Sequence, residues 1–220
     1  VTNAGTGANS GTVASLNNAG GTFSNLGTIS GLANISGGAF TTTGTIGGGL
    51  TNSAVTNAEG TINGPINNLA GGTFNLTGNL LGNDLFNNSG QLVSSGNQAI
   101  NGITTLTNSG TITQQNNVAG DVLTIGGNLN ASNGVINLDV SLNNPAAVSD
   151  QIVVAGALTG TVNVNFNSIG ASDLDVPGDT LVISSLNNSG SSIGAITGLD
   201  PGVFVQNQFV DNGQNYVIRT

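Results

Sequence analysis

The stretch Asn108-Ser109-Gly110-Thr111-Ile112 contains a short motif that recurs along the first two-thirds of the chain. Each copy reads as a turn, a glycine, a short polar residue and then one large apolar residue. Self-similarity of this kind predicts a stack of like units rather than one compact set of unlike elements. The other copies are Ser10-Gly11-Thr12-Val13, Gly21-Thr22-Phe23, Asn25-Leu26-Gly27-Thr28-Ile29, Gly44-Thr45-Ile46, Glu59-Gly60-Thr61-Ile62, Gly72-Thr73-Phe74 and Asn88-Ser89-Gly90-Gln91-Leu92.

Around each motif the apolar residues alternate with Thr, Ser or Asn, as in Phe74-Asn75-Leu76. Alternation at period two predicts short strands that face a core on one side and water on the other. Glycine and asparagine between the strands tolerate the positive φ that tight corners require. No window has the helical spacing of apolar residues, and glycine is too frequent for stable helices. The chain is therefore expected to be all-β.

A single unit has only about two inward side chains, so it cannot bury a core alone. Coils stacked roughly 4.8 Å apart would pair their strands in parallel and bury one continuous core. At about twenty residues per coil the chain would make on the order of ten coils, with Thr and Asn aligned into ladders. The predicted fold is a parallel β-helix, or β-solenoid. The alternative is an antiparallel sandwich or barrel with turns roughly every 8–12 residues.

The pattern changes near Val118, where the strands become longer and richer in β-branched residues. We expect residues 1–117 to form Gly-, Asn- and Thr-rich solenoid repeats. Residues 118–220 should form a C-terminal cap of longer, partly antiparallel strands that promotes folding of the rod. Within this cap, Val153 is predicted to point into the core.

Two local features carry more specific expectations. Asp211-Asn212-Gly213 predicts a hairpin turn between strands at Val203–Val205 and Tyr216–Ile218. The adjacent apolar pairs Leu80-Leu81 and Leu85-Phe86 do not fit strict alternation. They predict either a corner of the coil or a strand that is covered on its outer face.

The run from Val122 through Ser149-Asp150-Gln151-Ile152-Val153-Val154-Ala155-Gly156 to Tyr216 resembles the C-terminal part of the passenger domain of bacterial autotransporters. Its most specific feature is the Ser-Asp pair followed by an apolar strand and a glycine. The resemblance implies a right-handed parallel β-helix at the cell surface or in secreted form. It also implies export by an outer-membrane β-barrel translocator in the same precursor, and a stable terminal segment that promotes passenger folding.

Charged residues make up 5% of the chain, far below the usual quarter. Arg219 is the only cation against ten acids, and the formal net charge is −9. Nucleic acids and anionic lipids both require clustered Lys or Arg, so neither is an expected partner. The absence of Cys excludes disulfides and thiolate sites, and no apolar run approaches the roughly 20 residues of a membrane helix. Because Val1 begins within the repeat pattern, we expect the chain to be a piece of something longer.

No enzymatic activity is expected. Nucleophilic catalysis by Ser usually needs a His or Lys base, and the chain has neither. Two carboxylates could support glycoside hydrolysis, but the acids are scattered along the sequence. We predict no catalytic residue, no cofactor and no metal site built on His or Cys. The acids considered are Asp84, Asp121, Asp139, Asp150, Asp173, Asp175 and Asp179.

The segment Asp173-Leu174-Asp175-Val176-Pro177-Gly178-Asp179 is the one local cluster of acids. Three carboxylates in one loop suit Ca²⁺, whereas Pro-Gly is typical of a solvated turn. The segment also lacks the glycine spacing of calcium-binding toxin repeats, so the turn is the favoured interpretation. Asp150 is likewise interpreted as a turn residue that accepts backbone N–H bonds before a strand.

The leading functional hypothesis is an autotransporter passenger fragment, displayed or released, that acts as an adhesin or structural stalk. One alternative is a self-associating extracellular filament or matrix protein, because flat Asn/Thr faces and coil ends can pair with other chains. Another is a secreted effector that binds a host receptor. The expected partners are the translocator and a host-cell surface protein or glycan, or further copies of the chain. All three hypotheses share one fold, so the fold does not choose between them.

Overall fold

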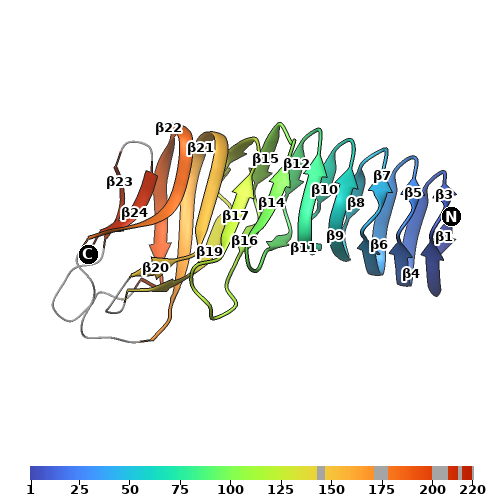
Figure 1. Cartoon of the computed structure of the whole chain (residues 1–220), viewed down its shortest axis with the longest axis horizontal. Coiled ribbons are helices and arrows are strands. Elements are labelled where there is room, and N and C mark those ends of the chain that lie inside the picture. Colours follow the sequence, from blue (N-terminus) through green and yellow to red (C-terminus); the bar gives the residue numbers. More distant parts are fainter. Residues whose placement is uncertain (143–146, 171–177, 200–207, 213–214, 220) are drawn as a thin grey trace.

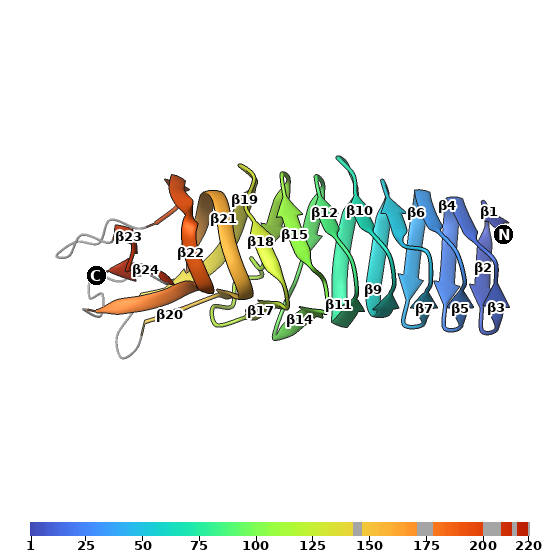
Figure 2. The same cartoon turned by 90° about the horizontal axis from the view of Figure 1, so that it is seen from above.

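The computed structural model describes residues 1–142, 147–170, 178–199, 208–212 and 215–219, and every regular element in these ranges is a strand. The chain winds into a long rod whose coils follow one another from the N-terminus to the C-terminal end (Figure 1). The view from above shows the same stack (Figure 2). Strands of adjacent coils pair in parallel. The predicted parallel β-helix is confirmed, and the sandwich or barrel alternative is wrong.

Each coil contributes to three faces of the rod, and the longer strands bend round a corner onto a second or third face. Face A contains β1 (Thr2–Asn3), β4 (Leu16–Asn25), β6 (Ala33–Thr42), β8 (Leu50–Asn52), β10 (Ile66–Asn68), β12 (Phe86–Asn88), β15 (Thr105–Asn108), β18 (Asn128–Asn130), β21 (Gln151–Ser168) and β22 (Asp179–Thr197). Face B contains β2 (Thr6–Asn9), parts of β4 and β6, β9 (Val55–Ile62), β11 (Thr73–Gly82), β13 (Gln91–Val93), β16 (Thr111–Thr113), β19 (Val135–Ser141) and parts of β21 and β22. Face C contains β3 (Thr12–Val13), β5 (Thr28–Ile29), β7 (Thr45–Ile46), parts of β9 and β11, β14 (Gln98–Asn101), β17 (Val122–Ile125) and parts of β21 and β22.

The large apolar residue of the repeated motif lies in the core. On face C, Ile29, Ile46 and Ile62 are successive register partners and are fully buried. The Thr that precedes each of them pairs with the equivalent Thr of the next coil, as expected for a ladder. Burial of each such isoleucine contributes roughly 1.5–3 kcal/mol, so the core grows by a similar increment with every coil.

A second row of inward residues is polar and lies at the end of face A. Asn52 donates to the Oδ1 of Asn68 (2.8 Å), Asn68 to Asn88 (2.7 Å) and Asn88 to Asn108 (2.8 Å). The same amides also donate to backbone carbonyls near the corner of the next coil. Asn68 Nδ2, for example, donates to the carbonyl of Gln91. The predicted asparagine ladder is confirmed. It satisfies buried carbonyl groups at corners where the strand pairing is interrupted. Its buried members are Asn3, Asn18, Asn52, Asn68, Asn88 and Asn108, with Ile35 on the rung between Asn18 and Asn52.

The substitution Asn68→Ala is expected to lower the free energy of unfolding by roughly 2–4 kcal/mol. It removes the donor to Asn88 and the acceptor for Asn52, both in sites without access to water. Chemical denaturation measures the loss. The matched control is Asn67→Ala, one residue away on the outward side, which should change stability by less than about 0.5 kcal/mol. Equal losses in the two variants would contradict a role for the buried ladder.

The coils lengthen toward the C-terminal end and finish in the expected cap. Asn3 and Asn18 are register partners 15 residues apart, Asn68 and Asn88 are 20 apart, and Leu129 and Leu158 are 29 apart. The last long strands are β21, with 18 residues, and β22, with 19. Among the described residues, the cap contains three antiparallel pairings: β20 (Val148–Ser149) with β19, β24 (Asn215–Arg219) with β22, and β23 (Gln208–Asp211) with β24.

The hairpin predicted at Asp211 is confirmed by the antiparallel pairing of β23 with β24. Its first strand runs over Gln208–Asp211, and the predicted strand at Val203–Val205 lies outside the described residues. Tyr216 and Ile218 of β24 are buried, so this last strand covers the end of the core. The Tyr216 hydroxyl lies 2.9 Å from the Ser191 hydroxyl.

The orientation predicted for Val153 is wrong. Its neighbours Ile152 and Val154 point into the core, and Val153 lies half-buried on the outer side of face C. The register explains the difference, because Ile152 and Val154 pair with the inward residues Leu123 and Ile125. A shift of one residue would turn every side chain of the strand to the opposite face. In an unbroken apolar run the sequence does not show which of the two alternatives holds.

The adjacent apolar pairs each contain one inward and one outward residue. Leu80 and Phe86 are fully buried, whereas Leu81 and Leu85 are 51% and 42% exposed. Leu85 lies between β11 and β12, so the predicted corner is correct for that pair. Leu81 lies within β11 and is exposed, so the prediction of a strand covered on its outer face is wrong for it.

Candidate functional site

The structure brings together three acids that are far apart in the sequence, Asp121, Asp139 and Asp150. The expectation that the acids are scattered is therefore wrong for these three. Asp150 is fully buried, and its Oδ1 accepts the N–H groups of Gly120 and Asp121, both at 3.0 Å. Its Oδ2 accepts the N–H of Asp139 at 2.7 Å. Asp150 accepts backbone N–H bonds as predicted, but the donors are in other segments rather than in its own turn.

Asp139 is also fully buried and binds residues 114–120, a segment between β16 and β17 that we call the strap. Its Oδ2 accepts the N–H groups of Asn116 and Asn117, both at 2.7 Å, and of Val118 at 3.2 Å. Its Oδ1 accepts the Nδ2 of Asn167 from β21 at 2.5 Å. One carboxylate therefore joins the strap to two later strands.

Further bonds of the strap reach the same strands. Gln115 Nε2 donates to the carbonyl of Asn165, 50 residues later in the sequence, at 3.2 Å. Asn116 Nδ2 donates to the Oδ2 of Asp121 at 2.7 Å. The carboxylates of Asp139 and Asp150 accept N–H groups from distant segments and so hold coils together, whereas the carboxylate of Asp121 accepts from Asn116, only five residues earlier. Among the residues that the structure describes, no group of three or more His, Cys, Asp or Glu side chains is arranged to hold a metal ion.

Burial raises the pKa of Asp150 from 3.8 to about 6. Backbone N–H bonds from Asp139 and Asp121 oppose this shift, and the nearby carboxylates of the same two residues add to it. The folded protein thus binds this proton more tightly than the unfolded chain does, so acidification through this range favours the folded state.

The free energy of unfolding is expected to rise by on the order of 2 kcal/mol as the pH falls from about 7.5 to about 4. The stabilisation by protonated Asp150 is complete below the pKa that this carboxyl has in the unfolded chain. It is lost as the pH rises through about 6, the pKa of Asp150 in the folded protein. Urea denaturation across this range measures it. Asp150→Asn removes the titrating group and should flatten the profile, whereas a wild-type stability that falls on acidification to pH 4 would contradict the prediction.

The other acids that the structure describes, Glu59, Asp84, Asp179 and Asp211, lie in exposed or partly exposed positions. Asp179 pairs with Arg219 through two bonds of 2.8 Å, and this partner lowers the pKa of Asp179. Asp173 and Asp175, the rest of the predicted acidic turn, lie outside the described residues. Asp84 accepts the N–H of Leu85 at a coil corner.

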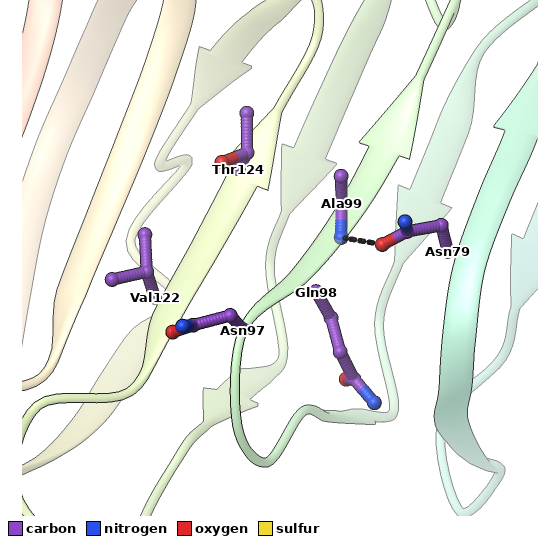
Figure 3. A pocket seen from close by; sticks show the side chains of 6 residues that line it. All are labelled: Asn79, Asn97, Gln98, Ala99, Val122 and Thr124. Carbon is purple, nitrogen blue, oxygen red and sulfur yellow. Dashed lines mark hydrogen bonds between the residues drawn. The ribbon is translucent and has the colours of Figure 1, made fainter.

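A shallow pocket of about 340 Å³ lies on the outer side of face C and crosses three coils (Figure 3). Ala99 of β14 lies at its centre, because it is the register partner of Thr124 in β17. On the opposite side, Asn79 Oδ1 accepts the N–H of Ala99 at 2.9 Å. A methyl group between two longer side chains leaves the depression. The pocket is lined by Asn79, Asn97, Gln98, Ala99, Val122 and Thr124.

All six lining residues are uncharged, and part of their hydrogen-bonding capacity is unused. The amide of Gln98 is engaged, since it donates to the carbonyl of Leu76 (2.9 Å) and accepts from Ser94 Oγ (2.8 Å). Within the described part of the chain, the Asn97 amide, Asn79 Nδ2 and the Thr124 hydroxyl have no hydrogen-bond partner. The side chain of Val122 adds an apolar wall. Such a lining can exchange hydrogen bonds with a neutral ligand.

Sequence reasoning identified neither the pocket nor the acid cluster. The sequence does mark Asp139 as unusual, because Asp is depleted in strands and this one lies between the apolar residues Leu138 and Val140. The pocket gave none, because Asn79, Ala99 and Thr124 become neighbours only through the register of three coils.

The described residues contain no helix long and apolar enough to span a membrane. No protein-family model matches the chain. Over 73 residues, 33% of its length, the chain is 44% identical to the probable autotransporter YfaL of Escherichia coli strain K12. Over 67 residues, 30% of its length, it is 31% identical to the uncharacterized protein YuaQ of the same strain. The matches span 6% and 5% of those two proteins. Over about a third of its length, the chain is thus similar to a small part of a probable autotransporter.

Proposed function

We propose that the chain is part of an autotransporter passenger, displayed at the bacterial surface or secreted, and that it acts as an adhesin or structural stalk. The observation that carries the proposal is the long parallel β-helix with an almost uncharged outer surface. The first 120 residues contain two acids, Glu59 and Asp84, and no cation. The partial similarity to a probable autotransporter supports the same conclusion.

A rod of this kind binds through repetition rather than through one deep site. On face A the outward position is Asn or Thr in every coil from Asn17 to Asn130. Rows of neutral donors and acceptors suit other neutral, hydrogen-bonding surfaces. Many weak contacts made together give avidity without a high affinity at any single point. The lack of His, Lys and Cys supports a role without catalysis.

In this proposal the partner within the precursor is an outer-membrane translocator. The longest strands, β21 and β22, lie in the C-terminal part of the rod. If export delivers that end first, the cap folds first and offers its edge to each following coil. A host-cell protein or glycan is the external partner.

Surface display tests the proposal. The chain, fused ahead of an autotransporter translocator in Escherichia coli, should become accessible to antibody and protease on intact cells. These cells should also adhere to host-cell layers or extracellular matrix more strongly than cells that carry the translocator alone. Display without any gain in adhesion would contradict the adhesin role. Turnover of a polysaccharide or peptide that a single Asp substitution abolishes would contradict the non-catalytic role.

Self-association is a second candidate, favoured by the Asn/Thr row on face A. Asn34 donates to Asn17 (3.0 Å) and Asn87 to Asn67 (2.9 Å), so the row is already ordered for contact with a like surface. Light scattering of the purified chain should then increase with concentration. Asn67→Asp would place like charges on both copies and should reverse the association.

A further inference from the structure

We propose that the pocket over Ala99 binds an uncharged carbohydrate unit. The inference rests on the proposed adhesive function and names the ligand class for one site on the rod. It does not concern the ladder on face A, which lies on another side of the coil.

The pocket is formed where side chains of three successive coils meet on the outer side of face C. Asn79, Ala99 and Thr124 occupy adjacent coils, which lie roughly 4.8 Å apart. The small side chain of Ala99 makes the floor, and Asn97 and Val122 lie beside it (Figure 3). A volume of about 340 Å³ is near the lower end for ligand pockets and suits one sugar ring better than a folded domain.

The chemistry of the lining matches a sugar. Each sugar hydroxyl both donates and accepts, and so do the amide of Asn97 and the hydroxyl of Thr124. Asn79 still offers its Nδ2, because only its Oδ1 is engaged by the protein. The side chains of Val122 and Ala99 provide apolar contact for the C–H groups of the ring.

The pocket offers no charge for a charged ligand. Arg219 is the only cation in the sequence and is paired with Asp179 in the cap. Two acids lie near the pocket without lining it: Asp121, which precedes Val122 in the sequence, and Glu59, which lies in the coil before that of Asn79. Asp121 is buried and bonded to Asn116, and Glu59 packs against the backbone of Gly78. A charged ligand would lose hydration here without gaining an opposite charge.

A shallow site without an aromatic ring should bind weakly, with a dissociation constant on the order of millimolar. Display of many rods on one cell would compensate through avidity. The experiment is an NMR titration of the purified chain with neutral oligosaccharides that end in glucose, galactose or N-acetylglucosamine. Sialylated and uronic-acid oligosaccharides, and an amino-sugar oligomer, are the charged arms.

At least one neutral sugar should shift the amide resonances of Asn79, Asn97 and Ala99. Ala99→Leu fills the floor and should weaken binding by about tenfold or more, and Asn97→Ala by about threefold. Ala39→Leu is the matched control, because Ala39 is a half-buried outward residue of β6 on face B. It should leave binding unchanged. Circular dichroism confirms that each variant is folded, and Asn97→Ala, on an exposed turn, provides the test if Ala99→Leu does not fold.

Three results would overturn the inference: no binding of neutral sugars at millimolar concentration, stronger binding of a charged arm, or equal effects of Ala99→Leu and Ala39→Leu. The outcomes also separate this inference from the proposed function. Displayed rods that adhere to cells without binding sugar would refute the sugar site alone. Rods that bind sugar at this pocket but do not adhere would refute the adhesin role alone.

Discussion

Replacing Ile152 by Asp should prevent the whole rod from folding. Ile152 is fully buried and pairs with Leu123 in the preceding coil and Ile183 in the following one. A carboxylate at this position would be buried without a partner, at a cost of several kcal/mol. The site lies in β21, which contributes six hydrophobic side chains to the buried core: Ile152, Val154, Leu158, Val162, Val164 and Phe166.

The matched change Ile46→Asp should loosen only the N-terminal end. Ile46 is equally buried on the same face and pairs with Ile29 and Ile62. In a linear stack each coil contacts only its neighbours, so damage far from the nucleus should remain local. We expect the cap to be the nucleus, because its long strands bury more apolar area and offer a stable edge to the next coil.

Amide hydrogen exchange on both variants distinguishes the two cases. Ile152→Asp should abolish protection along the whole chain, and Ile46→Asp should abolish it only in the first few coils. Equal loss of protection in the two variants would refute a polarised rod. So would a wild-type chain in which the first fifty residues exchange most slowly.

Replacing Asp150 by Ala should lower the free energy of unfolding by roughly 3–5 kcal/mol. The change removes the acceptor of three N–H groups, those of Gly120, Asp121 and Asp139. Asp121 and Asp139 are themselves buried, so water cannot easily replace the lost oxygens. Each unsatisfied buried donor costs about 1–3 kcal/mol. Asp150→Asn keeps one acceptor oxygen and should cost less than Asp150→Ala.

The loss should be greatest where the acid cluster joins the coils. Hydrogen exchange should accelerate first in the strap, which includes Gly120, and at Asp121. Exchange in β19 should accelerate next. Asp84→Ala is the control, since Asp84 accepts one N–H at a corner where water can replace it. It should cost less than about 1 kcal/mol. If the two alanine variants lost similar stability, the buried cluster would have no special role.

The acid cluster also shows why charge is rare elsewhere in this chain. A coil in a solenoid presents each residue either to the core or to an outward ladder of like residues. An isolated charge in the core is costly, and like charges in a ladder repel one another. Asp139 and Asp150 are tolerated because each accepts at least three N–H bonds, several of them from irregular segments between strands. We infer that these acids replace strand pairing where the coil is interrupted by the strap.

Local patterns in the sequence are enough to predict that the chain is a stack of coils made of parallel strands. In the motif at Gly110-Thr111-Ile112 and in its copies, the apolar residue points inward, and the polar residue before it, a Thr in every copy except at Gln91, points outward as predicted. The change of pattern near Val118 likewise predicted longer, partly antiparallel strands at the C-terminal end. Such features depend on neighbours in the sequence, and alternation is visible at that range.

Which residues of different coils meet is visible only in the three-dimensional structure. Coil lengths vary from 15 residues at Asn3 to 32 at Val164, so no fixed period predicts the partners. Three features depend on that register: the outward orientation of Val153, the contact between Asp121, Asp139 and Asp150, and the pocket over Ala99. The physical reason is that register is set by burial summed over whole faces, and a one-residue slip in any coil would turn its core side chains to water.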